Sequence, residues 1–411
     1  MADATCAGCG CACDDIEATV AESRLTGLTR TCPLGDAWFA ERTADRPPVA
    51  RIDGRAASVE EAADAAAAIL AQARAPLVYG LGQTSCEAQR RAVALAEAVG
   101  AFVDPAGGSG AGLAHQAIGS STATFGEIRD RAELVVAWRA DPAVTNPRLL
   151  GRLRLDRAGR GSRTLVVVDA QRTATAEEAD AFVELDAVHD VEALWALRAL
   201  VGRAPFDRDR AGELPLDALD ELAERLLGAR HVALLYGDGV AGDELNALAL
   251  FALVRDLSRD RHAVTLGLRR EGNARGAEDV LAWQTGFPAA VSFALGYPRA
   301  NPGELSAAAL LQRGEIDAAL VVASDPLEDL PAAAAERLRE VPIVVVDERD
   351  TATAAAARVA FVAGAAGVDV AGTVHRMDGV PVPLRAPLAG ERGRAGSIED
   401  LLTAIAGRVE G

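Results

Sequence analysis

Short apolar runs alternate along this chain with longer segments whose apolar positions recur at helical spacing. The short runs are rich in Val and Leu and end in turn residues, a pattern typical of parallel strands that are buried on both faces. The longer segments have the period of helices that cover one face of a sheet. The predicted strands are 75–79, 134–138, 164–169, 231–236, 263–266, 318–323 and 343–347, and the predicted helices include 86–99, 191–201, 243–257 and 332–340.

This alternation predicts an α/β fold of doubly wound parallel sheets, preceded by a small cysteine-rich cap. A chain of 411 residues is long enough to form more than one hydrophobic core. We expect the seam between the cap and the body at Pro47-Pro48. The segment 203–217 is rich in charge and proline, which predicts a surface connection rather than a domain boundary.

Five of the six cysteines lie in the first 32 residues, where few apolar neighbours are present to bury them. Cys6, Cys9 and Cys13 have spacings that allow their thiolates to converge on one centre, and Cys32 can complete a four-ligand set. Cys11 lies outside this set. The spacing by itself leaves open an iron–sulfur cluster, a zinc ion, disulfides and a former site that is now empty.

Composition narrows the function classes. The formal net charge is −18, which argues against nucleic acid and anionic membrane surfaces as partners. All 42 basic residues are arginines, so chemistry that requires a lysine is excluded. No secretory signal or membrane-spanning stretch is apparent, which predicts a cytoplasmic protein with reduced cysteines and favours metal ligation over disulfides. We expect Cys86 to pack as a small hydrophobic residue.

The candidate chemistry outside the cap is sparse. Gly237, Gly239 and Gly242 form a G-x-G-x-x-G turn after a predicted strand, but no acidic partner for a ribose follows at the expected distance. A phosphate-binding turn and a tight strand–helix turn both remain open. The five histidines form no metal-ligand or hydrolytic set. His115, beside Gln116, is the one best placed to line a site, and the alternative is an ordinary core or surface histidine.

Several segments together resemble the B subunit of formylmethanofuran dehydrogenase, a relative of molybdopterin oxidoreductases such as formate dehydrogenase. The resemblance extends over nearly the whole chain, and the segment Gly-Thr-Val-His-Arg-Met-Asp-Gly-Val-Pro at 372–381 is specific to this group. The other segments that carry the resemblance are 6–16, 84–89, 141–148, 168–175, 283–286, 297–304 and 323–326.

The resemblance implies a cluster-bearing cap followed by two dinucleotide-binding-like α/β domains, the second inserted in the first. The domains expected on this basis are 1–46 for the cap, 47–140 and 331–411 for the first α/β domain, and 141–330 for the second. It also implies that the four-cysteine set holds a [4Fe–4S] cluster. The turns that would face a pterin dinucleotide in such relatives contain Gly237, Gly239, Asp141, Asp169 and Asp325.

One segment departs from the redox members of this group. In those members a Cys or selenocysteine that binds molybdenum or tungsten, followed by a His, precedes the counterpart of His115-Gln116. Here the segment 104–113 contains neither, and Ser109 is the only candidate donor in reach. A soft metal centre needs a strong donor at this position, so we expect no molybdenum or tungsten pterin.

With its redox site lost, the chain is similar to the B subunit of bacterial formyltransferase/hydrolase complexes. In such a complex a formyl group passes from formyl-tetrahydromethanopterin to methanofuran on one subunit, and another subunit hydrolyses it to formate. The resemblance implies a non-redox structural subunit, with no catalytic residues of its own, whose partners are the formyltransferase and hydrolase subunits of the A, C and D types. The alternative is an active molybdenum or tungsten formylmethanofuran dehydrogenase subunit.

Overall fold

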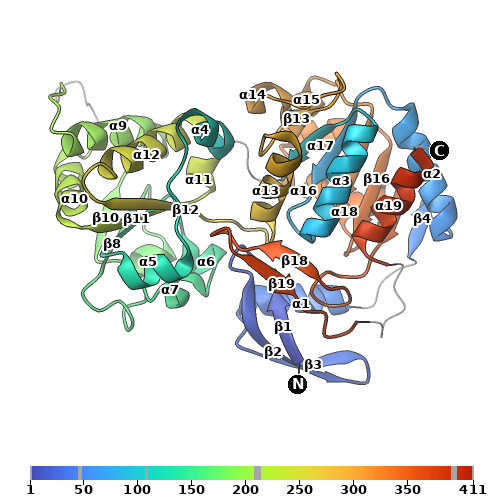
Figure 1. The fold of residues 1–411 in the computed structure, drawn as a ribbon, viewed down its shortest axis with the longest axis horizontal. Coiled ribbons are helices and arrows are strands. Elements are labelled where there is room, and N and C mark those ends of the chain that lie inside the picture. Colours follow the sequence, from blue (N-terminus) through green and yellow to red (C-terminus); the bar gives the residue numbers. More distant parts are fainter. Residues whose placement is uncertain (1, 45–48, 107–109, 208–213, 390–395, 410–411) are drawn as a thin grey trace. The chain divides into compact units, whose positions relative to one another are not determined.

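The computed structural model describes residues 2–44, 49–106, 110–207, 214–389 and 396–409. The chain forms two compact units: unit 1 is Met1–Gly107 with Glu271–Gly411, and unit 2 is Gly108–Arg270 (Figure 1). The α/β class and the insertion of one α/β unit into another are therefore confirmed. The Pro47-Pro48 seam, Ser109 and residues 208–213 of the expected surface connection lie outside the described residues.

The boundaries of the inserted unit differ from 141 and 330. Strand β8 (Leu134–Trp138) pairs with strands of unit 2, and β15 (Ala318–Val322) pairs with strands of unit 1. Hydrophobic periodicity locates both strands correctly. It does not specify which sheet each strand joins, because that choice depends on contacts distant in sequence.

Unit 1 contains a large sheet with five parallel strands at its centre. Along the sheet the parallel strands follow the order β7-β6-β15-β16-β17, with antiparallel additions at both edges. In chain order this is 2-1-3-4-5, the flavodoxin-like doubly wound arrangement. The strands are β4 (Ala50–Ile52), β5 (Arg55–Ala56), β6 (Pro76–Gly80), β7 (Phe102–Pro105), β13 (Val291–Ser292), β14 (Arg299–Ala300), β15, β16 (Ile343–Asp347) and β17 (Val359–Val362).

Alternate residues of these strands enter two cores. On one face, side chains such as Val78 and Leu320 pack against long helices, and on the other face Leu77 and Val321 pack against shorter ones. All four side chains are at most 1% exposed, which explains why the strands have continuous apolar sequences. The helices are α2 (Val59–Gln72), α3 (Cys86–Ala98), α13 (Ala274–Thr285), α14 (Pro302–Leu305), α15 (Ala307–Gln312), α16 (Pro326–Asp329), α17 (Ala332–Arg339), α18 (Ala352–Ala356) and α19 (Ile398–Val409).

The N-terminal cap is part of unit 1 and has a small sheet of its own. Its three antiparallel strands are β1 (Ala2–Cys6), β2 (Cys13–Ala21) and β3 (Arg24–Thr29), followed by helix α1 (Pro33–Thr43). Pro33 stands at the first position of α1, where its missing N–H has no cost. A hairpin of β18 (Gly372–His375) and β19 (Pro381–Leu384) belongs to the same unit, and Thr5 of β1 donates a hydrogen bond to Pro383 O at 2.8 Å.

Unit 2 is a five-stranded parallel sheet in the order β10-β9-β8-β11-β12. In chain order this is 3-2-1-4-5, which again is doubly wound. Helices cover both faces (Figure 1). The elements are α4 (Gly110–Ile118), α5 (Phe125–Arg131), β8, α6 (Pro142–Thr145), α7 (Leu149–Arg152), β9 (Thr164–Asp169), α8 (Ala174–Glu178), β10 (Ala181–Glu184), the 3-10 turn η1 (Ala187–His189), α9 (Asp190–Val201), α10 (Leu216–Gly228), β11 (His231–Tyr236), α11 (Asp238–Ala241), α12 (Glu244–Leu257) and β12 (His262–Gly267).

The two sheets repeat one local design. Strands β10-β9-β8-β11-β12 of unit 2 correspond in spatial order to β17-β16-β15-β6-β7 of unit 1, although the chain visits them in a permuted order. Directly after β8 and β15, Arg139 and Ala323 both have a φ of 48° and donate a backbone hydrogen bond of 3.0 Å to the neighbouring strand. In both places one residue separates this position from an Asp-Pro pair, so the carboxyl edges of both sheets carry equivalent turns.

Among the described helices, none combines the length and the apolarity that a membrane crossing requires.

Candidate functional sites in the cap and at the carboxyl edges of the sheets

The first candidate site is the cysteine group of the cap. Cys6 at the end of β1 and Cys13 at the start of β2 are directly opposite partners in the antiparallel pair. The turn between them includes Cys9, whose carbonyl accepts the N–H of Ala12 at 3.1 Å. Cys32 is the residue before the first turn of α1 and so lies at the positive end of that helix dipole. The hairpin of β1 and β2 therefore holds Cys6, Cys9 and Cys13, and α1 adds the more distant Cys32.

The surroundings of Cys6 show which thiols converge. Burial raises the pKa of Cys6 to about 12, the Gly8 N–H at 3.4 Å from its Sγ opposes this, and the charges of Cys13, Cys9 and Cys32 raise it further. A Cβ built on Gly35 would lie 3.2 Å from Cys6 Sγ and 3.9 Å from Cys32 Sγ. The absence of a side chain at Gly35 therefore leaves space beside these two sulfurs.

Cys11 has different neighbours. Its pKa is raised above the ordinary value chiefly by hydrogen bonds with Cys13 and Cys9, and then by burial. Cys11 is absent from the groups that affect the pKa of Cys6. Cys11 is therefore in contact with two of the four thiols, Cys13 and Cys9, and its place outside the ligand set stays a prediction.

The cysteine group does not have the spacing of a ready-made site for one ion. Within the described part of the chain, no group of three or more His, Cys, Asp or Glu side chains could hold a metal ion. A tetrahedral zinc site requires sulfurs about 2.3 Å from the metal. An iron–sulfur cubane is larger and holds its thiolates farther apart. The four-thiol set fits the chemistry of a cluster, and ligation itself stays a prediction.

The second candidate site is the pair of Asp-Pro turns. In unit 2, Asp141 Oδ1 accepts hydrogen bonds from the N–H and the hydroxyl of Thr175. In unit 1, Asp325 Oδ1 accepts the same two hydrogen bonds from Thr353, and its Oδ2 accepts the N–H of Ala352 at 3.1 Å. Each carboxylate links its Asp-Pro turn to the short helix after the neighbouring strand, α8 or α18, at the edge where doubly wound folds bind ligands.

In unit 2 the turns enclose a small cavity of about 120 Å³. Asp141, Asp169 and Gly237 lie around it, as the sequence expectation grouped them, whereas Gly239 is not among its lining residues and Asp325 belongs to unit 1. The lining residues are Arg139, Ala140, Asp141, Thr145, Asn146, Asp169, Gly237, Asp238, Leu268 and Arg270.

The glycine motif has a steric explanation. A Cβ on Gly237 would lie 2.1 Å from the carbonyl oxygen of Arg139, so this turn requires glycine for close backbone approach. Gly239 is less constrained, at 3.3 Å from the Arg139 side chain. The following helix α11 has only four residues. Of the two interpretations left open by the sequence, the tight strand–helix turn therefore accounts for Gly237.

Comparison with known proteins finds relatives along most of the chain, although no family model matches it. The B subunit of tungsten-containing formylmethanofuran dehydrogenase 2 from Methanocaldococcus jannaschii is 35% identical over 92% of this chain and 92% of that protein. Its counterpart in Methanococcus maripaludis is 30% identical over 96% of this chain and 95% of that protein. The chain belongs to the family of formylmethanofuran dehydrogenase B subunits.

The formyltransferase/hydrolase branch of this family is similar as well. The B subunit of the formyltransferase/hydrolase complex Fhc from Methylorubrum extorquens is 30% identical over 67% of this chain and 74% of that protein. A chain in the crystal structure of the formyltransferase/hydrolase complex (FhcABCD) from Methylorubrum extorquens, in complex with methylofuran, superposes with a TM-score of 0.71. That match has 28% identity and covers 88% of this chain and 98% of the other.

In this member of the B-subunit family, arginines missed by the sequence analysis fill the carboxyl edges. In unit 1, Arg42 of the cap is 1% exposed and donates from Nε to Glu348 Oε2 at 3.0 Å and from Nη2 to Gln83 Oε1 at 3.3 Å. Gln83 follows β6 and Glu348 follows β16, so Arg42 bridges the turns on both sides of β15. Nothing in the local sequence distinguishes Arg42 from a surface arginine.

Unit 2 has a different arginine at the corresponding edge. Arg139 donates to both carboxylate oxygens of Asp190 at 2.9 Å, to Leu185 O at 2.8 Å and to Asp169 Oδ1 at 3.4 Å. In the sequence, only the position of Arg139 between a predicted strand and Asp141 indicated that it lies at this edge. An arginine of this protein is thus hydrogen-bonded to acidic side chains at each carboxyl edge, Arg42 to Glu348 in unit 1 and Arg139 to Asp190 and Asp169 in unit 2.

The remaining sequence candidates are structural in this family member. The His115 ring of α4 packs on Phe251 with the ring centroids 4.8 Å apart. Cys86 is buried beside Asn273, and burial raises its pKa to about 11, as expected of a packed thiol. The sequence analysis missed a partly buried hydrogen bond between His375 Nδ1 and Asp279 Oδ2, which are 2.7 Å apart.

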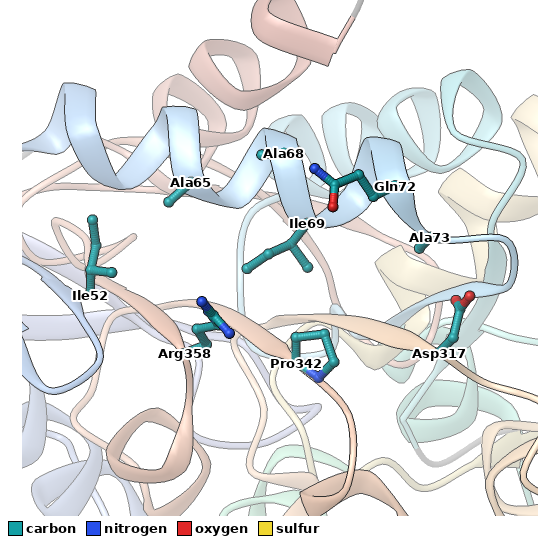
Figure 2. A pocket seen from close by; sticks show the side chains of 9 residues that line it. All are labelled: Ile52, Ala65, Ala68, Ile69, Gln72, Ala73, Asp317, Pro342 and Arg358. Carbon is teal, nitrogen blue, oxygen red and sulfur yellow. The ribbon is translucent and has the colours of Figure 1, made fainter.

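A larger cavity of about 430 Å³ lies beside α2 (Figure 2). It is at the amino ends of β15, β16 and β17, opposite to the edge where doubly wound folds bind ligands. Its Asp317 accepts the backbone N–H groups of Arg74 and Ala75 at 2.8 and 2.9 Å, which gives that carboxylate a structural role. The lining residues are Ile52, Ala65, Ala68, Ile69, Gln72, Ala73, Asp317, Pro342 and Arg358.

Proposed function

We propose that this chain is the B-type component of a formyltransferase/hydrolase complex and serves there as a non-redox structural subunit. The observation that carries the proposal is the segment between β7 and His115. It contains neither the cysteine nor the histidine that a molybdenum or tungsten centre would require at this place. The catalytic residues of such a complex would then lie on its other subunits.

The chemistry of the complex agrees with the loss of a redox centre. Formyl transfer breaks the C–N bond to tetrahydromethanopterin and forms an amide with the amine of methanofuran. Hydrolysis then adds water across that amide to give formate and the free amine. Neither step changes the oxidation state of the formyl carbon, so neither requires an electron carrier.

The space at the carboxyl ends of the strands also supports the proposal that this subunit binds no pterin. The cavity in unit 2 measures about 120 Å³, below the 300–1,000 Å³ typical of small-molecule sites. In unit 1 the buried Arg42–Glu348 pair occupies the corresponding edge. Among the described residues, the small cavity of unit 2 is therefore a poor match to a pterin dinucleotide, and this supports the non-redox assignment.

The partners of this chain would be the formyltransferase and formylmethanofuran hydrolase subunits of the A, C and D types. The support is the match to a chain of the FhcABCD crystal structure, which covers 98% of that chain. Permanent interfaces in such complexes commonly bury more than about 2,000 Å². The described surface exposes several large apolar side chains, including Trp195, Trp283 and Tyr297 at 50%, 63% and 56%.

For the cap, we propose that Cys6, Cys9, Cys13 and Cys32 bind a [4Fe–4S] cluster, with zinc as the alternative. The group would cross-link β1, β2 and α1 through four thiolates and would add its binding free energy to the folding of the cap. Iron and zinc analysis of anaerobically purified protein tests this assignment. Iron or zinc in stoichiometric amount supports it, and background levels of both contradict it.

A second candidate function is an active tungsten or molybdenum formylmethanofuran dehydrogenase. It is favoured by the 35% identity with the tungsten-containing enzyme's component over 92% of the chain. That reaction transfers two electrons between the formyl carbon and an acceptor, so it requires a redox centre. The two functions therefore predict different metals and different partners.

The deciding experiment is affinity purification of the tagged chain from its native cell under anaerobic conditions. We expect transferase and hydrolase subunits to copurify, with no stoichiometric molybdenum or tungsten and no formylmethanofuran oxidation with an artificial electron acceptor. Stoichiometric tungsten together with acceptor reduction would establish the dehydrogenase instead. If the other subunits assembled an active complex without this chain, the structural role would be ruled out.

A further inference from the structure

A third cavity, of about 450 Å³, lies within unit 2 at the amino ends of β11 and β12. It is formed where helices α9, α10 and α12 end. The Asp-Pro turn of unit 2 and its small cavity lie at the other end of the strands, the carboxyl end. The lining residues are Arg198, Val201, Gly202, Arg203, Leu227, Asp256, Leu257, Arg259, Asp260 and Arg261.

The charge of this lining is opposite to that of the whole chain. Four arginines and two aspartates face the cavity in a protein with a formal net charge of −18. The two aspartates can neutralise only half of the guanidinium charge. The ends of three helices bring carbonyl groups to the same place, and arginines at such ends commonly serve as caps.

Contacts within the protein use only some of the hydrogen-bond donors of Arg261 and Arg198. Arg261 Nη1 donates to Leu226 O and Leu227 O at 3.0 and 2.6 Å, which caps α10. Arg198 Nε donates to Asp256 Oδ2 at 2.7 Å, and its guanidinium stacks 4.0 Å over the ring of Trp195. These contacts hold both arginines in fixed orientations.

One nitrogen of each of these two guanidinium groups has no acceptor among the described residues. Arg198 Nη1 and Arg261 Nε are buried and have no hydrogen-bond partner among the described atoms. A buried charged donor without an acceptor is costly, and such groups in native proteins are normally satisfied. An acceptor that enters the cavity would satisfy both donors, and a negatively charged one would also balance the excess of arginine.

We propose that this cavity binds a small ligand with two oxyanion groups, carboxylate or phosphate. One group accepts from Arg198 Nη1 and Arg261 Nε. The other is bound by Arg203 and Arg259 on the same lining. The Arg259 side chain is 75% exposed and its Nη2 lies 3.4 Å from Asp256 Oδ1, so it would bind the anion in exchange for this exposed ion pair. Guanidinium groups bind both kinds of oxyanion through paired hydrogen bonds, so the shared chemistry defines the ligand.

Titration of the full-length protein with inorganic pyrophosphate and, separately, with succinate tests this site and distinguishes the two sources. Calorimetry measures the affinity, and the fluorescence of Trp195 reports the position, because Arg198 stacks on its ring. We expect saturable binding of at least one probe, accompanied by a fluorescence change that is lost in Trp195→Phe while the calorimetric affinity is retained.

Charge variants connect the binding to these residues. The double variant Arg203→Gln/Arg259→Gln changes the lining and removes the exposed Arg259 end of an ion pair with Asp256, and it should weaken binding roughly tenfold or more because charge-assisted hydrogen bonds are lost. Arg261→Gln should do the same if it folds. Arg255→Gln, which removes one charge as Arg261→Gln does but at an exposed position of α12 outside the lining, should leave binding unchanged.

Two results would overturn the proposal. The first is no saturable binding of either probe at millimolar concentration and low salt. The second is binding that Arg203→Gln/Arg259→Gln weakens no more than Arg255→Gln does, since that would place the anion elsewhere on the surface.

Discussion

Substitution of Asp104 by asparagine measures the effect of burial on a carboxylate at the end of β7. The side chain is 8% exposed, and its Oδ2 accepts the N–H of Ala307 at 2.7 Å. Burial raises the pKa of Asp104 to about 7, and hydrogen bonds from the backbone N–H groups of Ala307 and Ala290 oppose the increase. The folded protein therefore holds a proton on Asp104 at pH values where the unfolded chain has lost it.

The sign of the pH dependence follows from this difference. The folded pKa lies above the ordinary value of 3.8, so the stabilisation is complete below that value and is lost as the pH rises to about 7. Each pH unit between the two pKa values corresponds to about 1.4 kcal/mol. The ionised carboxylate thus costs about 4 kcal/mol in full, and about 3 kcal/mol of this appears between pH 5 and pH 8.

Urea unfolding of the wild type and of Asp104→Asn at pH 5 and pH 8 measures this difference. The amide stays neutral and can still accept the Ala307 N–H, so the variant should gain about 3 kcal/mol relative to the wild type between the two pH values. Asp53→Asn, at a side chain that is 65% exposed, is the matched control and should show little change. Equal pH dependence in the wild type and Asp104→Asn would refute the assigned effect of burial.

Three further predictions concern buried contacts. Glu348→Gln removes the buried carboxylate that faces Arg42, while Glu41 remains 3.3 Å from the same guanidinium, and it should reduce the free energy of unfolding by about 3–5 kcal/mol, measured in urea. A loss below about 1 kcal/mol would show that the pair is hydrated. Thr353→Val removes the hydroxyl that links the Asp-Pro turn of unit 1 to α18 and should cost about 1–3 kcal/mol in thermal unfolding, with an unchanged melting temperature contradicting the link. Cys9→Ser should increase amide hydrogen exchange in the cap and lower its iron content, whereas Cys11→Ser should change neither, and equal effects of both would refute the four-thiol set.

The sequence by itself determined the class of this fold. The strands at 134–138, 164–169, 231–236 and 343–347 have the same bounds in the structure, because a strand buried on both faces must be apolar throughout. The inclusion of Cys32 with the clustered cysteines also came from spacing alone. These features are local or nearly local, and local composition is sufficient to encode them.

The tertiary structure alone decided where strands pair and what fills the carboxyl edges. β8 and β15 have similar apolar sequences and equivalent Asp-Pro turns, yet each joins a different sheet, which placed the inserted unit at Gly108–Arg270. Arg42 and Glu348 are separated by 306 residues, so no periodicity could pair them. Periodicity reports which faces are buried, whereas the identity of the buried neighbour depends on chain topology.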